Sequence, residues 1–546
     1  MSGLRQGSWW AGMLGLALLL SCHGGEQLQS PPSTDDGIGG GNGTPPPEQP
    51  GDPPPGEGEE PPPVGEEVPD SGTPVDPPPV EPDAGTNGPV GGGEPIPPDS
   101  ANWRFWSTAE GGPREVLGVT QDEGGNIWVA GGEDGLCLLR PGATALRCYT
   151  LADGLKPWAP WKGKDPAPEA RYLKVLSVTG GPAGTVFVGY EGRPNCESEF
   201  YKAPGVFEDP AIFKSGDADR VELQADGTLR VVHYDLHSPA HSVPGYGHRE
   251  KLCSVNRIVW DKARNSLWFA SNHGLAWGEP DYQGGEACAN TEVVAANAWV
   301  YTGGENRQRC KFGVMEHVHP AIAMGDGTSE ESRLAGDVWG VAVRPDGDVW
   351  LGTHIRTTRF KIMTNAVGHE GTGAPWNFEA ARKQSEEKKH RANRIDLWPD
   401  AVAEPQFPTH AQRKDDLVSD LALMPDGTVW VSSFAWGLAK LSDAGLVTGY
   451  LLEGDGDRNV SSLELDPRDG SLWIGHRWGK GLRRMHREGE FVSHNPALGG
   501  LSALPVWDIQ MVGSGDARKV LVAFSAQRDA TGTIVRPGAI GIYSGK

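Results

Sequence analysis

One hairpin motif recurs along the chain, and it constrains the fold more than any other feature. Residues 338–353, VWGVAVRPDGDVWLGT, alternate apolar and polar side chains, turn at PDGD and alternate again into a tryptophan. Alternation with a period of two is typical of a half-buried strand, and an Asp-Gly pair is typical of a hairpin turn. The seven copies, the last of them degenerate, begin at Val116, Val175, Val255, Val338, Val418, Val460 and Val506.

Two further strands follow most copies, such as GLCLLRPG and LRCYTLADG after the first hairpin. Four antiparallel strands per unit, repeated seven times, predict an all-β fold: a seven-bladed β-propeller of four-stranded antiparallel blades. Residues 101–112 are expected to form an outermost strand, and residues 539–545 a third strand that lacks its fourth. We therefore expect the N-terminal strand to close the ring and remove its open edges.

An aromatic residue stands near the start of the second strand in six copies. We predict that these side chains pack between blades rather than bind a ligand, because large aromatic side chains dominate cores of this kind. The six residues are Trp128, Phe187, Trp268, Trp350, Trp430 and Trp473.

The N-terminus has the pattern of an export signal. Residues 1–21 carry one charge, at Arg5, followed by the apolar run WWAGMLGLALLL, which is too short to span a bilayer comfortably. The following LLSC resembles a bacterial lipobox, which implies that Cys22 is lipidated and becomes the mature N-terminus. A plain secretory signal is the alternative. The lipobox resemblance favours a lipid-anchored envelope protein, in the outer membrane if the cell is Gram-negative.

Residues 22–100 are rich in Pro, Gly and acid, and we expect a disordered, extended tether. Residues 23–100 hold 16 acidic and no basic residues, so most of the net charge of -23 lies there. The remaining 101–546, the predicted propeller domain, has a formal charge of -8 once the tether and Arg5 are removed from the total. That charge argues against nucleic acid as a partner, because phosphate binding needs a basic surface.

Six cysteines remain after Cys22, and an even number in an exported chain suggests disulfides. Cys137 and Cys148 flank the turn LLRPGATALR and are the predicted pair. The pairing of the other four stays open.

The repeated unit resembles the two-component-regulator propeller repeats. It has an aspartate and a glycine in the turn and the pair GL after the second strand. It is more distantly similar to the streptogramin-lyase and NHL-like propellers. The resemblance covers 101–546 and implies a propeller found in sensor ectodomains and free periplasmic proteins. No transmembrane helix or kinase region follows the propeller in this sequence, so we do not expect it to signal as a receptor kinase does.

Propeller ligands usually bind at loops that leave the second strand, so the residues just past these strands are the candidate ligand-binding residues. They are Tyr190, His273, His354, Phe434, Trp436, His476, Arg477 and Trp478. The alternative is that they cap the channel and satisfy nearby backbone groups.

Histidine chemistry gives the second hypothesis. His317 and His319 form a His-x-His pair, a weak metal candidate because two ligands do not make a site. We predict no cofactor, with a divalent metal as the minor alternative. Streptogramin lyases use a histidine-centred site with a divalent ion, but their motif does not align here, so no catalytic residue is assigned.

These features favour a non-catalytic binding module, a monomer that meets the membrane only through its lipid anchor and binds a protein, peptide or glycan. A lyase or hydrolase is the first alternative, and it requires His273, His354 and His476 to converge. An assembly scaffold is the second alternative, and it requires an extended apolar patch on the rim or bottom face.

Overall fold

The described part of the chain belongs to one compact unit. By their contacts the residues divide into two units, Met1–Pro69 and Asp70–Lys546, and every described residue lies in the second. The computed structural model describes residues 96–158, 168, 171–192, 216–234, 236–238, 250–251, 254–271, 274–278, 280, 315–318, 338–345, 349–352, 356–360, 394–396, 417–434, 437–451, 459–477 and 480–545.

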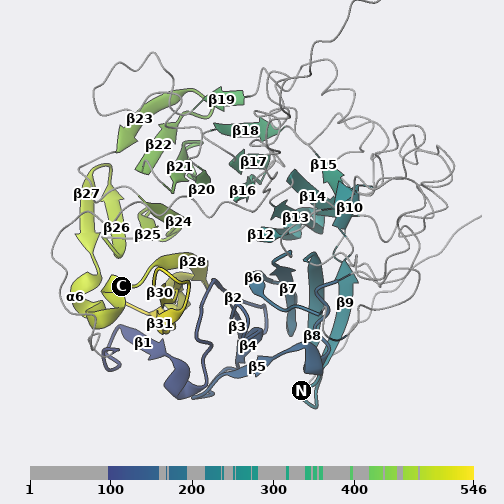
Figure 1. Ribbon diagram of the computed structural model, residues 1–546. Helices are drawn as coiled ribbons and strands as arrows, with labels where there is room; N and C mark the ends of the chain where they lie inside the picture. The colour runs from purple at the N-terminus through teal and green to yellow at the C-terminus, as the bar shows by residue number, and fades with distance from the viewer. Residues whose placement is uncertain are drawn as a thin grey trace, which may run out of the picture. The chain divides into compact units, whose positions relative to one another are not determined.

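The described residues are almost entirely β, in a series of four-stranded antiparallel sheets of propeller type (Figure 1). Five sheets take their strands in chain order. They are β2 (Gly118–Gln121), β3 (Ile127–Ala130), β4 (Leu136–Leu139) and β5 (Arg147–Tyr149); β6 (Val175–Gly180), β7 (Thr185–Tyr190), β8 (Ala218–Leu223) and β9 (Leu229–Tyr234); β16 (Gly340–Val343), β17 (Val349–Gly352), β18 (Arg356–Phe360) and β19 (Arg394–Asp396); β20 (Val418–Leu423), β21 (Val429–Ser433), β22 (Gly437–Leu441) and β23 (Val447–Leu451); and β24 (Val460–Leu465), β25 (Leu472–His476), β26 (Leu482–Arg487) and β27 (Glu490–Ser493).

Two sheets depart from this order. One has six strands, β12 (Val255–Asp261), β13 (Ser266–Ser271), β14 (Gly274–Gly278), β15 (Met315–Val318), β10 (Leu236–Ser238) and β11 (Glu250–Lys251), and β10 runs parallel to β15. The other combines β28 (Val506–Val512), β29 (Lys519–Phe524) and β32 (Ala539–Tyr543) with β1 (Trp103–Trp106), and Trp103 lies opposite Tyr543. The N-terminal strand of the described chain is therefore the outer strand of its last sheet.

Two short elements accompany this last sheet. They are a hairpin of β30 (Gln527–Arg528) and β31 (Ile534–Arg536), and α6 (Asn495–Leu498), the single α-helix in the part of the chain that the structure describes.

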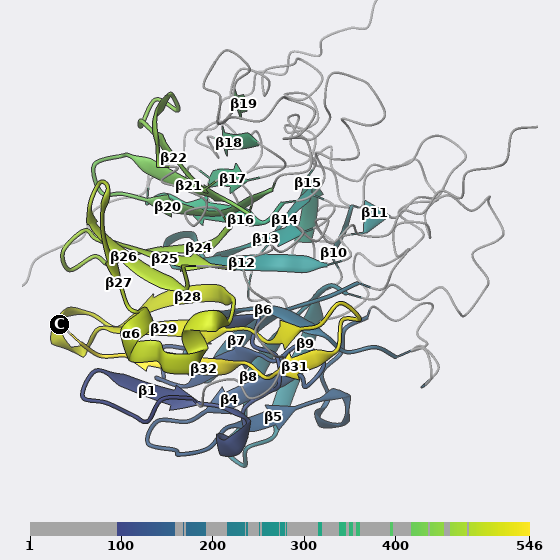
Figure 2. The same ribbon diagram turned by 60° about the vertical axis from the view of Figure 1, so that its left-hand side comes forward.

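The first strands of successive sheets contact one another. β2 contacts β6, and the contacts continue through β12, β16, β20, β24 and β28, which in turn contacts β2. Figure 2 shows the sheets that begin with β20, β24 and β28 stacked face to face. Each apolar sheet face is thereby covered by the next sheet.

The hairpin turns use the chemistry that the sequence predicts. Between β20 and β21 the N–H of Gly427 donates to the carbonyl of Met424 at 3.0 Å, and the N–H of Thr428 donates to Asp426 Oδ1 at 2.9 Å. Gly427 has a φ of 89°, which a side chain would strain. The homologous turn after β16 includes residues 346–348, which lie outside the described residues.

A β-bulge near the start of the first strand shapes the inner surface of the unit. In five sheets the register shifts between the first valine and the third residue, as between Val418 and Asp420. Such a bulge leaves the intervening residue unpaired and redirects its side chain. Ser419 in that position donates through its hydroxyl to the carbonyl of Val460 on the next sheet at 2.6 Å, and Asn256 donates likewise to Val338 at 3.1 Å. The bulge therefore links neighbouring sheets.

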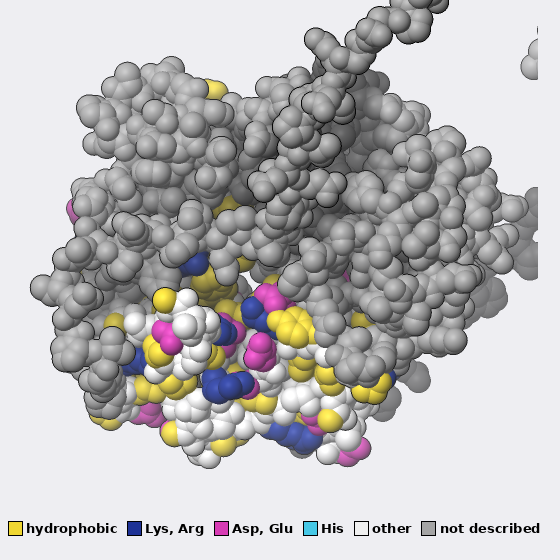
Figure 3. All heavy atoms as spheres, in the orientation of Figure 1, with side chains coloured by type: hydrophobic (Ala, Val, Ile, Leu, Met, Phe, Trp, Pro, Cys, Tyr) yellow, Lys and Arg dark blue, Asp and Glu magenta, His cyan; other side chains and the backbone are white. Residues whose placement is uncertain are grey.

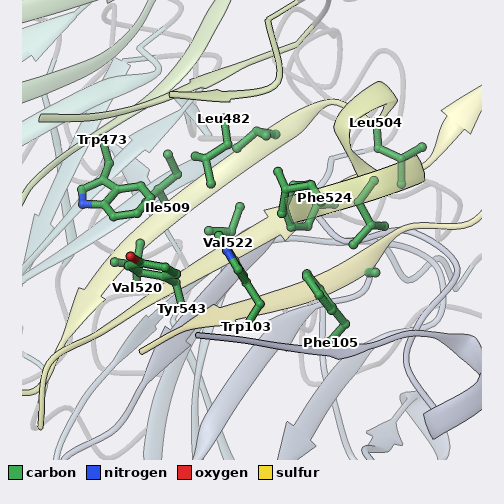
Figure 4. Packing of buried hydrophobic residues seen from close by; sticks show 14 residues of the cluster. Trp103, Phe105, Trp473, Leu482, Leu504, Ile509, Val520, Val522, Phe524 and Tyr543 are labelled. Atoms are coloured by element: carbon green, nitrogen blue, oxygen red, sulfur yellow. The ribbon is translucent and has the colours of Figure 1, made fainter. Parts of the chain in front are cut away.

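The six aromatic side chains of the second strands lie in the core, as predicted. Their exposed fractions range from 0% to 4%. Figure 4 shows Trp473 of β25 facing Tyr543 and Ile509 of the next sheet, and the ring centroids of Trp473 and Tyr543 are 5.3 Å apart. Trp103 of β1 belongs to the same cluster, 5.1 Å from Tyr543. Burial of such large apolar surfaces is the main force that holds one sheet against the next.

Candidate binding site at the central cavity

A cavity of about 350 Å³ lies where the first strands meet. The cavity is lined by residues in or next to β2, β6, β12, β16, β20, β24 and β28, and by Phe434, which follows β21. This volume falls within the usual range for a small-ligand pocket. Figure 3 shows acidic, basic and hydrophobic side chains close together along the lower side of a hollow on one face of the unit.

Three aromatic side chains and one arginine form the mouth of this cavity. The rings of Trp339 and Phe434 are perpendicular, with their centroids 5.3 Å apart. The rings of Phe434 and Trp507 are stacked, with their centroids 6.2 Å apart. The guanidinium carbon of Arg477 lies 4.9 Å from the centre of the Phe434 ring and 5.1 Å from that of Trp507. The mouth is thus an aromatic platform that already carries a cation.

The strand register explains why these four residues meet. Trp339 and Trp507 each come directly after the valine that begins a copy of the repeat, and Phe434 and Arg477 come directly after a second strand. In the antiparallel hairpins the start of the first strand pairs with the end of the second, as Val418 does with Ser433. All four side chains therefore lie at the same end of the sheets.

Below the mouth lies an arginine between two aspartates. Arg257, Asp420 and Asp508 are the third residues of their first strands, counted from the valine. Arg257 Nη2 lies 3.1 Å from Asp420 Oδ2, and Arg257 Nη1 lies 4.0 Å from Asp508 Oδ1. Backbone N–H groups hold both carboxylates, since Leu463 donates to Asp420 at 2.9 Å and Val119 donates to Asp508 at 3.0 Å. These bonds fix the charged layer to four sheets.

Glu464 of β24 is the fifth residue of its copy of the repeat, two positions beyond the level of Arg257, Asp420 and Asp508. The other residues at the fifth position are uncharged. The matching positions hold Thr120, Thr179, Val259, Ala342, Ala422 and Gln510. The backbone N–H of Met511 donates to Glu464 Oε1 at 3.2 Å, and within the described residues this is the hydrogen bond that Glu464 receives. The Glu464 carboxyl group therefore retains acceptor capacity that faces the cavity.

Burial and mutual repulsion raise the pKa of the cavity acids. Burial raises the pKa of Asp420 and of Asp508, while Arg257 acts against that rise. Burial, opposed by the Met511 N–H and reinforced by the two aspartates, raises the pKa of Glu464 to about 8. Burial acts to lower the pKa of Arg257, but the carboxylates raise it above its ordinary value. At pH 7 Glu464 is therefore mainly protonated and Arg257 is charged.

A second buried polar cluster lies in the sheet of β6–β9. The Tyr190 hydroxyl donates to Asp219 Oδ2 at 2.5 Å, and His233 Nδ1 is 2.8 Å from Asp219 Oδ1. His233 Nε2 is 3.4 Å from Asp217 Oδ2. Burial acts to lower the pKa of His233, but Asp217 and Asp219 raise it to about 9. The cluster is an imidazolium held between two carboxylates, and the side chain of Tyr190 is fully buried in it.

The structure places four of the eight candidate ligand-binding residues. Phe434 and Arg477 meet at the cavity mouth, whereas Tyr190 lies in the second cluster and His476 is 2% exposed at the end of β25. The other four lie outside the described residues, namely His273, His354, Trp436 and Trp478. Convergence of His273, His354 and His476, which an enzyme would require, is therefore not tested.

Some of the remaining predicted sites lie within the described residues, and the others lie outside them. The structure joins Cys137 of β4 and Cys148 of β5 in a disulfide, with the two residues directly opposite each other. The backbone of His317 lies in β15, while His319, Cys22 and the other four cysteines are outside the described residues. In the described ranges no group of three or more His, Cys, Asp or Glu side chains is arranged to hold a metal ion. The same ranges contain no helix long and apolar enough to cross a membrane.

The sequence reasoning missed the central residues of the cavity. Trp339 and Trp507 stand at the second position of their copies of the repeat, and Arg257, Asp420 and Asp508 stand at the third. The other copies have different residues at these positions. A charged residue inside an otherwise apolar first strand is unusual, since charges are rarely buried unless they are paired. Aligning the seven copies on their first valine would have revealed that signal.

Comparisons with known proteins find structures that resemble this chain at low sequence identity. No protein-family model matches the chain, and no curated protein matches it. The extracellular domain of BT4673 from B. thetaiotaomicron is 10% identical with a TM-score of 0.42, covering 80% of this chain and 39% of that chain. YCF48 from Cyanidioschyzon merolae is 11% identical with a TM-score of 0.43, covering 81% of this chain and 99% of that chain.

PorZ, an essential bacterial surface component of the type-IX secretion system of Porphyromonas gingivalis, is 13% identical with a TM-score of 0.37, covering 78% of this chain and 46% of that chain. The chain thus spans about two-fifths of the BT4673 domain and just under half of PorZ. At these identities and TM-scores the likenesses carry no argument about function, which rests on the site itself.

Proposed function

We propose that residues 101–546 form a seven-bladed propeller, closed by its N-terminal strand, that acts as a non-catalytic binding module. The pairing of β1 with β32 and the contact of β28 with β2 support closure. The seven first strands that line one cavity support the number of blades.

The observation that carries the binding function is the cavity mouth. Trp339 and Trp507 are only partly buried, and Arg477 keeps a guanidinium over the aromatic platform. Tryptophan and arginine are enriched among the hot spots of binding interfaces. The ligand that we propose is a protein, peptide or glycan that covers this mouth.

The location of the protein is also a proposal, and it rests on the sequence. We propose that residues 1–21 are a lipoprotein signal, that Cys22 carries the lipid, and that residues 22–100 are a tether. The chain would then be a monomer held at the outer membrane by its lipid alone. Metabolic labelling with a radioactive fatty acid tests this, since Cys22→Ser should abolish incorporation of the label.

Selection from a random peptide library and from a glycan array, using the full chain, tests the binding function. The affinity of every selected ligand is then measured for the wild type and for Trp507→Ala. Truncating a hot-spot side chain costs about 2 kcal/mol or more, so we expect an affinity loss of about 30-fold.

Leu446→Ala is the matched control, because Leu446 is 67% exposed on the turn between β22 and β23, far along the sheet from the mouth. The thermal unfolding midpoint of each variant verifies that it is folded. If the affinity of a ligand falls equally in Trp507→Ala and Leu446→Ala, or falls in neither variant, the mouth is not its binding surface.

A further inference from the structure

We propose that the central cavity receives a cationic side chain, an arginine or a lysine of a partner protein or peptide. This inference rests on the proposed binding function and specifies the chemistry of its ligand. The side chain would enter over Trp339 and end among Asp420, Asp508 and Glu464.

The charges that line the cavity are unequal in number. Arg257 is the one basic side chain among the lining residues, against the three carboxyl groups of Asp420, Glu464 and Asp508. Arg257 lies close to the two aspartates, which leaves Glu464 without an ion-pair partner within the described residues. Because Glu464 is mainly protonated at pH 7, the charges of Asp420 and Asp508 exceed that of Arg257 by one, and one further cation would balance them in this low-dielectric space.

The aromatic mouth points to the same chemistry. Arg477 lies over Phe434 and Trp507 and shows that the platform accommodates a guanidinium. The ring of Trp339 lies nearly perpendicular to those of Phe434 and Trp507, and among the described residues no cation lies over the Trp339 ring. A ligand guanidinium can stack there without displacing Arg477.

The layers of the cavity suit a long side chain. The mouth lies at the second position of the repeat, the aspartates at the third and Glu464 at the fifth. With about 3.3 Å per residue along a strand, Glu464 lies about 7 Å beyond the aspartate layer. The tether of this chain cannot supply the ligand, because residues 23–100 contain no lysine or arginine.

Isothermal titration calorimetry of the full chain with two capped pentapeptides tests the proposal. One is acetyl-Gly-Gly-Arg-Gly-Gly-amide, and the other carries citrulline, the neutral near-isostere of arginine, in place of the arginine. We expect the arginine peptide to bind at least tenfold more tightly than the citrulline peptide. Glu464→Gln and Asp508→Asn, which keep the shape and an acceptor oxygen, should each reduce this preference at least threefold.

Two further results distinguish the cationic site from a structural effect. Arg477→Ala should tighten binding of the arginine peptide, because it removes a like charge and frees two aromatic faces. Binding should also tighten by up to tenfold per pH unit between pH 6 and 8, since a cation favours ionised Glu464, whose neighbours in the cavity are Arg257, Asp420 and Asp508. Glu464→Gln should abolish this dependence on pH.

Equal binding of the two peptides, or no binding of either at millimolar concentration, overturns the proposal. So does an arginine preference that survives in both the Glu464 and Asp508 variants. Ligands from the library that lose affinity in Trp507→Ala and contain no basic residue would support the binding function and contradict the cationic pocket.

Discussion

Glu464→Gln should stabilise the protein, and the gain should grow with pH. Glutamine has nearly the shape of protonated glutamic acid and can keep the hydrogen bond from the N–H of Met511. In the folded chain Glu464 holds its proton up to about pH 8, whereas an ordinary glutamate loses it near 4.5. Between these values the folded state binds more protons than the unfolded state, so the stability of the wild type falls as pH rises.

The size of the effect follows from the two pKa values. One pKa unit corresponds to about 1.4 kcal/mol, so a rise from 4.5 to about 8 corresponds to at most about 5 kcal/mol. Glu464 faces a cavity and is only partly buried, so water in the cavity reduces the figure. We expect a gain of about 1 to 3 kcal/mol at pH 8.5, and none near pH 4.5.

Urea unfolding followed by tryptophan fluorescence at pH 4.5, 6, 7 and 8.5 measures this difference. Glu490→Gln is the control, because Glu490 lies on the outer strand β27 with its side chain 65% exposed, where substitutions change stability by at most about 0.5 kcal/mol. A stability difference for Glu464→Gln that stays flat from pH 4.5 to 8.5 would show that Glu464 titrates normally and would refute the description of the cavity.

Three further predictions concern the framework around the cavity. Trp473→Ala, which empties a fully buried site between two sheets, should lower the free energy of unfolding by about 3 to 5 kcal/mol in urea. Replacing Cys137 and Cys148 together by serine should cost about 2 to 3 kcal/mol, because the disulfide closes a short loop, and reducing agent should lower the unfolding midpoint of this variant less than that of the wild type. The His233 cluster stabilises the fold below pH 6.5, and this contribution should be lost as pH rises through about 9; His233→Gln should flatten the stability curve over that range.

The blade architecture could be read from the sequence because local and global signals agree. Most of the hairpin turns contain glycine, several as an Asp-Gly pair, and the aromatic residues of six second strands pack between sheets, as Trp350 and Trp473 do. The six-stranded sheet could not be predicted, because β10 and β11 come from a long insertion whose strands pair outside the repeat.

The site was predictable only in part. The rule that ligand-binding residues follow the second strand selected Phe434 and Arg477, and the strand register explains why both lie at the mouth of the cavity. The same rule chose Tyr190 and His476, whose side chains point into the core instead. Periodicity gives the strand, but it does not say whether a residue at the strand end faces the cavity or the next sheet.

The inner charged layer was missed because the bulge is invisible in a single strand. A strict alternation of sides would place Asp420 and Asp508 with the core residues of their strands. The register shift between the first and third residues brings both side chains to the cavity beside Arg257. Only the comparison of several copies, or the structure, reveals that shift.

Site-specific photocrosslinking shows directly whether the cavity mouth is the binding surface. p-Azidophenylalanine is introduced at Trp507 in one variant of the full chain and at Leu446 in another, and each is irradiated with the ligand selected from the library. If the ligand binds at the mouth, a crosslinked product forms at Trp507 and none forms at Leu446. A crosslink at Leu446 with none at Trp507 would contradict binding at the mouth.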